Sequence, residues 1–190
     1  DWSGRLLKIK TNQGTISSKK CIVTVSTNVL ANEILKFTPL LPLEKYEAFS
    51  NINLGLYNHI FVQLKNSFYK HFNIHKDTYL FSKITTKLLS PVGCFGSLKL
   101  HNFNLSYFDI GGGFAKELES AGDKASNDFI LKTLKSTFGS DVEKYITKSY
   151  ITSWGRNKYF LGSYSSAVPG KSHLREVLKT SIADKIFFAG

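Results

Sequence analysis

The hydrophobic and polar positions of the chain follow a β pattern near its start. Apolar and polar residues alternate over residues 5–10, residues 12–14 read Asn-Gln-Gly, and residues 20–25 form a nearly continuous apolar run. Alternation is typical of a half-exposed strand and a continuous run of a buried one, while Asn and Gly favour turns. Residues 5–26 are therefore predicted to form a β-hairpin followed by a returning strand.

The pattern then changes to helical spacing and back again. Residues 28–50 are predicted to form two short helices, which Pro39 and Pro42 separate because proline breaks a helix. From residue 56 to about residue 114, short apolar runs alternate with turn residues, which indicates a sheet. The three glycines at 111–113 are predicted to end this sheet as a flexible turn with no helix after them. The predicted strands are residues 60–64, 78–81, 96–100 and 105–110.

The remaining third combines one amphipathic helix with two strands. Apolar residues recur at helical spacing over residues 123–138, and Gly139 ends that helix. Residues 145–154 and 185–189 are predicted strands. The fold class is therefore α+β, with a mixed β-sheet flanked by helices in the middle and α/β remnants at both ends.

Composition places the chain among globular proteins. Of its 190 residues, 42% are hydrophobic and 14% are aromatic, which is too apolar for a disordered chain. No apolar run approaches the roughly 18 residues of a membrane span, so no membrane span is expected, and no signal peptide is expected either. The chain contains no Met, and we therefore expect it to be a piece of a longer protein.

The net charge of +11 raises the question of nucleic-acid binding. The lysines are spread along the whole chain and accompany no RNP, zinc-finger or helix-turn-helix pattern. We therefore expect a solvated basic surface and no nucleic-acid partner. Two isolated cysteines, Cys21 and Cys94, favour a reducing compartment and hence a cytoplasmic location.

Motifs for phosphate, zinc and dinucleotide binding are incomplete. Gly170-Lys171-Ser172 resembles the end of a phosphate-binding loop, but Ser165 replaces the upstream glycine that such a loop needs. His71 and His75 are spaced as in zinc proteases but lack the Glu between them, so no metal site is predicted. The chain has no G-x-G-x-x-G fingerprint, so it is not expected to grip a dinucleotide pyrophosphate by itself.

The last forty residues carry the strongest chemical signal. They contain Thr152-Ser153-Trp154, the run YFLGSYS at residues 159–165, a Pro-Gly pair, and IFFAG at residues 186–190. Trp154 and Tyr164 are ten positions apart, and a glycine-rich hairpin between them would present both rings as walls of a flat apolar slot. Aromatic faces of this kind pack well against planar ligands.

This segment resembles the C-terminal signature of the flavin-containing amine oxidases, which reads T-x-W, a short turn, G-S-Y-S, a Pro/Gly turn and F-F-A-G-E. Residues 37–42 (FTPLLP) are similar to the family's F-x-P-x-L-P, and residues 55–64 (GLYNHIFVQL) to its G-x-x-N-K-V/I-x-L-x-F, with His59 in the Lys column. Ser26 replaces a Pro of the family, which is expected to loosen a turn without touching the chemistry. The chain stops at Gly190, where the family places the Glu.

The resemblance implies a division into three parts. Residues 1–28 would belong to an incomplete FAD-binding, Rossmann-like domain, residues 29–148 would form the substrate-binding domain, and residues 149–190 would return to the FAD-binding domain with the flavin-pocket segment. The predicted strands at 145–154 and 185–189 would make this return. The glycine fingerprint for the FAD pyrophosphate would lie upstream of the chain.

The resemblance also implies roles for individual residues. His59 and Tyr164 are the implied catalytic residues: the family's Lys holds a water against flavin N5, which an imidazole can also do by hydrogen bonding, and Tyr164 would be the aromatic wall that admits the amine. Ser163 occupies a column that is Cys in monoamine oxidases with covalent flavin, so FAD is expected to bind non-covalently. The implied cofactor-binding residues are Trp154, Gly162, Ser163, Tyr164, Ala189 and Gly190.

The main hypothesis is a fragment of an FAD-dependent amine oxidase, in which hydride passes from the carbon that bears nitrogen to flavin N5 and oxygen is the expected acceptor. One alternative is a flavin-dependent desaturase or dehydrogenase of the same superfamily. Another is a non-catalytic basic interaction module. The isolated fragment is expected to be inactive, and no single charged residue in 70–140 marks the substrate as an amino acid, a polyamine or a peptide.

Overall fold

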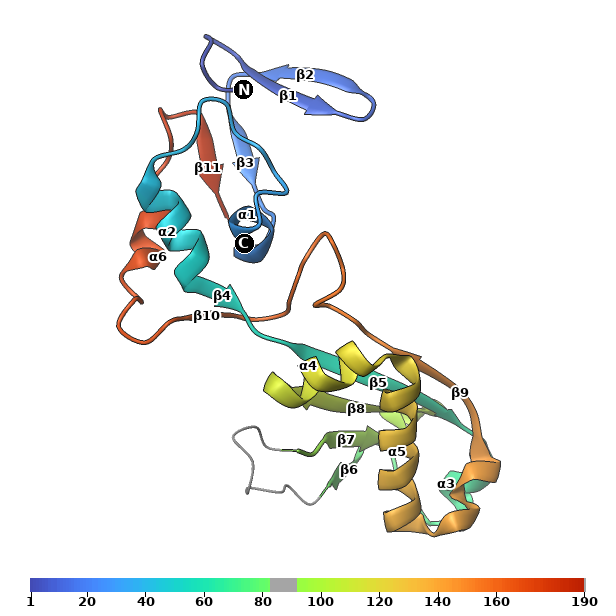
Figure 1. The fold of residues 1–190 in the computed structure, drawn as a ribbon. Coiled ribbons are helices and arrows are strands. Elements are labelled where there is room, and N and C mark those ends of the chain that lie inside the picture. Colours follow the sequence, from blue (N-terminus) through green and yellow to red (C-terminus); the bar gives the residue numbers. More distant parts are fainter. Residues whose placement is uncertain (83–91, 190) are drawn as a thin grey trace. The chain divides into compact units, whose positions relative to one another are not determined.

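The computed structural model describes residues 1–82 and 92–189 (Figure 1). The chain divides into two compact units. One unit joins Asp1–Gly55 to Asn157–Gly190, and we call it the terminal unit. The other comprises Leu56–Arg156, and we call it the central unit. The mixture of helices with an antiparallel sheet confirms the predicted α+β class.

The terminal unit contains three two-stranded sheets and three short helices (Figure 1). The first sheet is the predicted hairpin, and the second pairs the returning strand in parallel with the last strand of the chain. The third is antiparallel and pairs a strand of the first half with one that begins at the last residue of the GSYS run. The elements are β1 (Leu7–Thr11), β2 (Gly14–Ser18), β3 (Cys21–Val23), α1 (Thr27–Ala31), α2 (Leu43–Asn51), β4 (Ile52–Leu54), β10 (Ser165–Ala167), α6 (Leu174–Lys179) and β11 (Ile186–Phe188).

The core of the terminal unit lies between the β3–β11 pair and α2. Phe49 of α2 is buried there against the ring of Phe188 on β11, with 5.5 Å between ring centroids. Lys45 is buried in the same helix and donates hydrogen bonds to the carbonyls of Val177, Leu178 and Thr180 at the end of α6. Val177 O also accepts from Thr180 N, the C-cap of α6. The last carbonyls of a helix are short of partners within it, so Lys45 satisfies this end of α6 and ties it to α2.

The central unit is one five-stranded antiparallel sheet with the strand order β6-β7-β8-β5-β9. Figure 1 shows α4 and α5 lying over one face of this sheet. The elements are β5 (Tyr57–Leu64), α3 (Asn66–His71), β6 (Thr78–Phe81), β7 (Phe95–Leu98), η1 (Leu100–Asn102), β8 (Leu105–Gly111), α4 (Gly112–Ala121), α5 (Asp123–Phe138), η2 (Ser140–Tyr145) and β9 (Ile146–Ile151).

Burial alternates along the two central strands of this sheet, β5 and β8. Ile60, Val62 and Leu64 of β5 are buried, in one cluster with Leu118 of α4 and Leu134 of α5. Intervening side chains point to the opposite face, because successive residues of a strand alternate. That opposite face is rich in rings, and we call it the aromatic face. It comprises Tyr57, His59 and Phe61 of β5, Tyr107 and Asp109 of β8, Phe95 of β7, Tyr79 and Phe81 of β6, and Tyr150 of β9.

Three expectations about elements are wrong. The glycines at 111–113 do not form a free turn, because α4 begins at Gly112. The apolar residues that follow the glycines pack on the sheet, and this burial outweighs the low helix propensity of glycine. The predicted strand at 145–154 is β9, which pairs with β5 in the central unit and does not rejoin the terminal unit.

The third concerns the hairpin between Trp154 and Tyr164. No such hairpin forms, because β9 pairs with β5 whereas β10 pairs with β4. The two rings lie in different units, and the slot between them stays a prediction.

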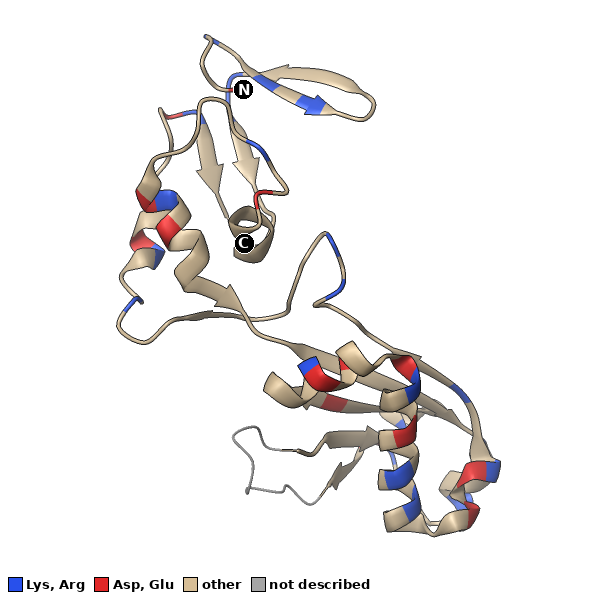
Figure 2. Cartoon of the chain, viewed as in Figure 1, with Lys and Arg blue, Asp and Glu red and all other residues tan. Residues whose placement is uncertain are grey.

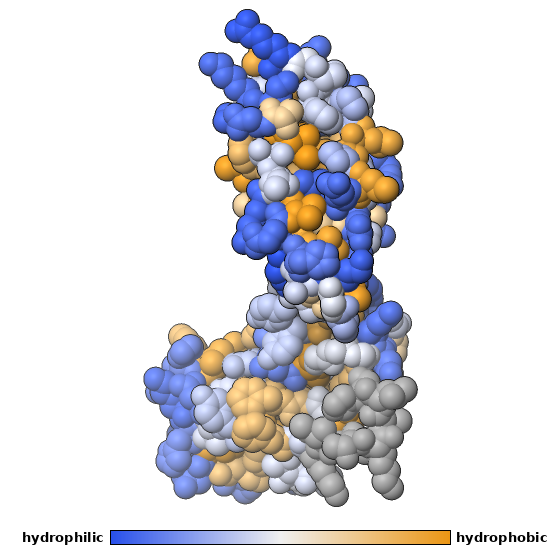
Figure 3. All heavy atoms as spheres, turned by 90° about the vertical axis from the view of Figure 1, so that its left-hand side faces the viewer, coloured by the Kyte–Doolittle hydropathy of each residue, from blue (hydrophilic) through white to orange (hydrophobic). Residues whose placement is uncertain are grey.

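Charge is spread over both units. Figure 2 shows Lys and Arg on helices, strands and loops of each unit, interspersed with Asp and Glu. Figure 3 shows apolar atoms at the surface of the unit that carries the β1–β2 hairpin, beside hydrophilic ones. Among the residues that the structure describes, no helix is both long enough and apolar enough to cross a membrane.

Candidate functional site

A cavity of about 590 Å³ lies wholly within the terminal unit. Strands β3 and β11 end at it, and the GSYS run forms another of its walls. Its lining combines aliphatic and aromatic side chains with hydroxyl groups and two cations, Arg175 and Lys179. The lining residues are Val23, Thr24, Val25, Ser26, Thr27, Leu30, Phe49, Ile52, Leu54, Phe160, Gly162, Ser163, Tyr164, Ser165, Arg175, Leu178, Lys179, Phe188 and Ala189.

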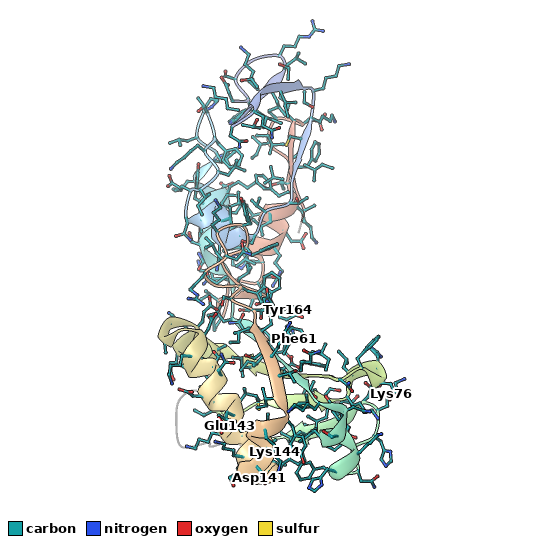
Figure 4. The ribbon with its side chains drawn as sticks, turned by 90° about the vertical axis from the view of Figure 1, so that its right-hand side faces the viewer. Phe61, Lys76, Asp141, Glu143, Lys144 and Tyr164 are labelled. Atoms are coloured by element: carbon teal, nitrogen blue, oxygen red, sulfur yellow. The ribbon has the colours of Figure 1, made fainter. Side chains whose placement is uncertain are left out.

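The GSYS run is held in place by backbone hydrogen bonds to the residue that follows β4. Ser163 N donates to Gly55 O and Gly55 N donates to Tyr164 O, each over 2.9 Å. Gly162 makes this approach possible, since its φ is +148° and a Cβ there would lie 2.5 Å from Leu54 Cβ. Tyr164, labelled in Figure 4, is 72% exposed, so its backbone is fixed while its ring stays accessible.

Two side chains at the start of α1 secure the residues just before this run. Ser26 accepts a hydrogen bond from Val29 N, which caps α1, and donates one to Phe160 O. Asn28 Nδ2 donates to Leu161 O over 2.7 Å. The expectation that Ser26 only loosens a turn is therefore wrong: its hydroxyl links α1 to the cavity wall.

His59 lies on the aromatic face of the central unit, near the start of β5. Its Nδ1 is 2.5 Å from Asp109 Oδ1, on the neighbouring strand β8. A carboxylate can only accept hydrogen bonds, so Nδ1 carries the shared proton, which leaves Nε2 as an acceptor when the imidazole is neutral. Three rings surround the imidazole, those of Tyr57, Phe61 and Tyr107, with centroid distances of 5.5–5.9 Å.

Trp154 lies in a turn directly after β9, and two buried polar side chains hold that turn. Asn58 Oδ1 accepts a hydrogen bond from Trp154 N over 3.1 Å. Asn58 Nδ2 in turn donates to Glu119 Oε2 over 2.7 Å. The carboxylate of Glu119, on α4, also accepts from Gly155 N (3.4 Å) and Arg156 N (2.6 Å).

The turn is further restricted by its glycine. A Cβ on Gly155 would lie 2.7 Å from Leu56 Cδ2 and 3.0 Å from Glu119 Oε1. Thr152 connects the turn to His59, because its hydroxyl accepts a hydrogen bond from His59 N over 2.7 Å. Thr152 and Trp154 are therefore bonded to two adjacent residues of β5, His59 and Asn58.

The structure thus gathers the predicted residues into two groups. Gly162, Ser163, Tyr164 and Ala189 line the cavity of the terminal unit. His59 and Trp154 belong to the central unit. Gly190 lies outside the described residues, and the catalytic and cofactor-binding roles of all these residues stay predictions.

Sequence reasoning missed the residues that hold these groups in position. Asp109 and Glu119 are single carboxylates that no sequence motif marks, and they meet His59 and Asn58 only through strand pairing and helix packing. Asn58 does belong to a sequence pattern, the family-like run at residues 55–64. That pattern was the one sequence feature that could have marked Asn58 as part of the site. Within the described ranges 1–82 and 92–189, no group of three His, Cys, Asp or Glu side chains is placed to hold a metal ion.

The cavity of the terminal unit fits part of a flavin cofactor. A flavin ring is flat and apolar on its faces and carries hydrogen-bonding atoms along its edge. The cavity offers Phe49, Phe188 and aliphatic side chains beside the hydroxyls of Thr24, Ser26 and Ser163. Its volume lies within the range of cofactor and ligand sites.

Comparison with known proteins identifies the family of the chain. A sequence profile of the family described as "Flavin containing amine oxidoreductase" matches residues 1–190. Polyamine oxidase 4 of Oryza sativa subsp. japonica is 29% identical over 189 residues, which cover 96% of this chain and 36% of that protein. L-amino-acid oxidase of Trimeresurus stejnegeri is 29% identical over 178 residues, which cover 88% of this chain and 32% of that protein. The chain thus spans about a third of the length of these relatives.

Solved structures show the same fold. Putrescine oxidase, in its wild-type form bound to putrescine, superimposes with a TM-score of 0.75 at 15% identity, covering 99% of this chain and 40% of that one. Cyclohexylamine oxidase from Brevibacterium oxydans IH-35A gives a TM-score of 0.68 at 15% identity, covering 97% of this chain and 40% of that one. Since the family profile matches along its whole length, the chain belongs to the flavin-containing amine oxidoreductases.

Proposed function

We propose that the chain is part of an FAD-dependent oxidase that acts on the C–N bond of an amine. The observation that carries this proposal is the cavity of the terminal unit, where the ends of β3 and β11 meet the GSYS run. Bound FAD would supply the acceptor for a hydride from the carbon that bears nitrogen, and oxygen would regenerate it.

In this proposal the two units have different tasks. The terminal unit holds part of the cofactor, with Gly162, Ser163, Tyr164 and Ala189 at the cavity wall. The central unit carries His59 on its aromatic face. The boundaries at 28/29 and 148/149 that the resemblance implies stay a prediction. The compact units differ from them in that α1, α2 and β4 belong to the terminal unit.

The residues of the chain have distinct parts in the reaction. The Tyr164 ring excludes water from one side of the amine, and this desolvation favours the neutral amine that can release a hydride. Asp109 orients His59 so that Nε2 can accept a hydrogen bond from water. Ser163 has a hydroxyl that forms no thioether, so FAD is held non-covalently.

The direct test is the absorbance of the full-length protein with a panel of amines under anaerobic conditions. We expect a bound-flavin spectrum that bleaches with at least one amine and recovers when oxygen is admitted. The panel should include polyamines and amino acids, because relatives named polyamine oxidase and L-amino-acid oxidase both match the chain. Bleaching without recovery in oxygen would favour the dehydrogenase alternative, and a protein that binds no flavin would favour the basic interaction module.

The cytoplasmic location stays a prediction. Cys21 and Cys94 are both free thiols, which is compatible with the predicted cytoplasmic location but does not establish it.

A further inference from the structure

The β1–β2 hairpin of the terminal unit lies in a strongly basic stretch of the chain. Residues 2–32, which contain the hairpin, include no Asp or Glu. Figure 2 shows blue segments along β1 and no red one on either strand of the hairpin. The cations of this stretch are Arg5, Lys8, Lys10, Lys19 and Lys20.

Most of these charges have no acidic neighbour. Among the residues that the structure describes, Lys20 is the one member of this group that forms an ion pair, with Asp184. Exposed lysines elsewhere in the chain are often neutralised locally, as Lys124 is by Asp128 one turn away on α5. The hairpin therefore carries positive charge that no carboxylate of the described ranges offsets.

The strand register gathers part of this charge on one face of the hairpin. Lys8 lies opposite Ser17, and Lys10 lies opposite Thr15. Residues directly opposite each other in a sheet point to the same face. All four are exposed, and we call them the lysine face. Leu7 points the other way and is buried in the core of the terminal unit, so the lysine face is turned away from that core.

The lysine face has the groups that attract phosphates. Residues two positions apart in a strand are about 7 Å from each other, which is within the Debye length of about 8 Å at physiological ionic strength. The potentials of Lys8 and Lys10 therefore reinforce each other. The hydroxyls of Ser17 and Thr15 beside them can donate hydrogen bonds to phosphate oxygens.

The chemistry of this face also discriminates among polyanions. Single-stranded nucleic acids bind through rings that stack on the bases, and residues 5–20 contain no aromatic residue. The carboxylates of an acidic peptide are best matched by the planar fork of arginine, whereas both cations of the lysine face are lysines. A lysine ammonium is a point charge that needs no fixed partner geometry, which suits an array of mobile lipid headgroups.

We propose that the lysine face binds the surface of a bilayer that contains anionic phospholipids. Lys8 and Lys10 contact the headgroups, and the unpaired charges of Arg5 and Lys19 strengthen the attraction. The binding is peripheral and reversible, because it uses surface charge and inserts no segment into the bilayer. It goes beyond the proposed oxidase function and depends on neither the flavin nor the amine.

The test is cosedimentation of the full-length protein with phosphatidylcholine vesicles that contain either no phosphatidylserine or about 30 mol% of it. At about 0.1 M NaCl, we expect binding to the anionic vesicles alone, and about 0.5 M NaCl should abolish it by screening. Lys8→Gln/Lys10→Gln should weaken binding about 25-fold, since each basic residue near an anionic bilayer contributes about fivefold. Both side chains are exposed, so the urea midpoint should not change.

The matched control is Lys124→Gln/Lys144→Gln. It lowers the net charge by the same amount, but these exposed lysines of the central unit are already paired with Asp128 and Asp141. We expect it to change vesicle binding less than about twofold. An equal loss in the two double variants would overturn the proposal, because the net charge and not the lysine face would then drive binding.

A second variant tests the face without removing a lysine. Ser17→Glu places a carboxylate directly opposite Lys8 and should weaken vesicle binding at least about fivefold. Equal sedimentation of the parent with both kinds of vesicle would contradict the proposal. Tighter binding to a DNA duplex that depends on Lys8 and Lys10 would assign the face to a nucleic acid instead. Self-association of Lys8→Gln/Lys10→Gln with undiminished vesicle binding would show that the lysines only protect an exposed strand edge.

Discussion

Glu119 illustrates how much one buried side chain controls at the candidate site. It is 7% exposed, and its carboxylate accepts hydrogen bonds from Asn58 and from two backbone N–H groups of the turn after Trp154. Three donors therefore converge on one acceptor group. Without that acceptor, the turn that carries the indole loses its fixed geometry.

We expect Glu119→Gln to destabilise this turn by about 1–3 kcal/mol. The NH₂ group of the new amide would face N–H donors that now bind a carboxylate oxygen, so a buried donor would lose its acceptor. The measurement is the urea midpoint of Trp154 fluorescence in a Trp2→Phe background, where Trp154 is the single indole. Glu117→Gln is the control, since Glu117 is an exposed residue of the same helix. Equal midpoints for the two variants would contradict the role of Glu119.

Gly162 is the second residue on which the site depends. Its φ of +148° is unfavourable for other residues, and a Cβ would lie 2.5 Å from Leu54 Cβ. Gly162→Ala should therefore lower the urea midpoint of the terminal unit and the flavin content of the full-length protein. Gly170→Ala is the matched control: Gly170 also has a positive φ of +79°, but a Cβ there meets nothing within 4 Å. We expect Gly170→Ala to cost about 1–2 kcal/mol and Gly162→Ala more. Equal effects would show that the close approach to β4 is unimportant.

Tyr164 is expected to act on the amine more than on the cofactor. Tyr164→Ala should lower kcat/KM for the best amine about tenfold while most of the flavin is retained, because one aromatic wall is lost. Tyr164→Phe keeps the ring face and should be tolerated better. Tyr159→Ala is the control, since Tyr159 is also an exposed aromatic residue of this segment. Parent-like turnover in Tyr164→Ala would remove Tyr164 from the site.

At the level of elements, α3 is fixed to the sheet by a buried tyrosine. Tyr69 is almost completely buried, and its hydroxyl lies 3.1 Å from Ser106 Oγ on β8. Burial raises the pKa of Tyr69, and the hydrogen bond to Ser106 offsets only part of this. The folded state therefore keeps its proton to a higher pH than the unfolded state, whose tyrosine titrates near 10.

This shift predicts how stability changes in alkali. The contribution of Tyr69 is fully present below about pH 10 and is lost as the pH rises from there through the raised pKa of the folded state. Urea midpoints at several values from pH 8 to 11 should therefore fall more steeply for the parent than for Tyr69→Phe. Tyr150→Phe, at an exposed tyrosine of the same unit, should keep the slope of the parent. A parent-like slope in Tyr69→Phe would show that Tyr69 does not control this loss.

At the level of the whole molecule, the question is how the cofactor is held. Ser163 lines the cavity with a hydroxyl, and the chain contains no G-x-G-x-x-G fingerprint. We expect acid or heat to release FAD from the full-length protein without proteolysis, and the 190-residue chain alone to show little or no yellow colour. Flavin absorbance that stays with the denatured polypeptide would contradict non-covalent binding. A strongly yellow 190-residue chain would show that FAD binds without the glycine motif that contacts its pyrophosphate.

The sequence by itself determined those parts of the protein that local patterns encode. The alternation in residues 5–26, the helix at Asp123–Phe138 and the strands around Ile60 and Phe108 follow from hydrophobic spacing and turn residues, and the structure confirms them. The motifs around His59 and Tyr164 identified the family, which the profile match confirms. These features are readable because each depends on residues that are near neighbours in the chain.

Only the tertiary structure decided which distant residues meet. Asp109 pairs with His59 across 50 residues and Glu119 with Asn58 across 61, and both pairs depend on strand register and on where α4 packs. The glycines at 111–113 begin a helix instead of a loop because burial of the following apolar residues outweighs local propensity. Trp154 and Tyr164 lie in different units because the strands near them pair differently: β9 pairs with β5, and β10 pairs with β4. Strand pairing depends on the whole sheet, and no local sequence pattern specifies it.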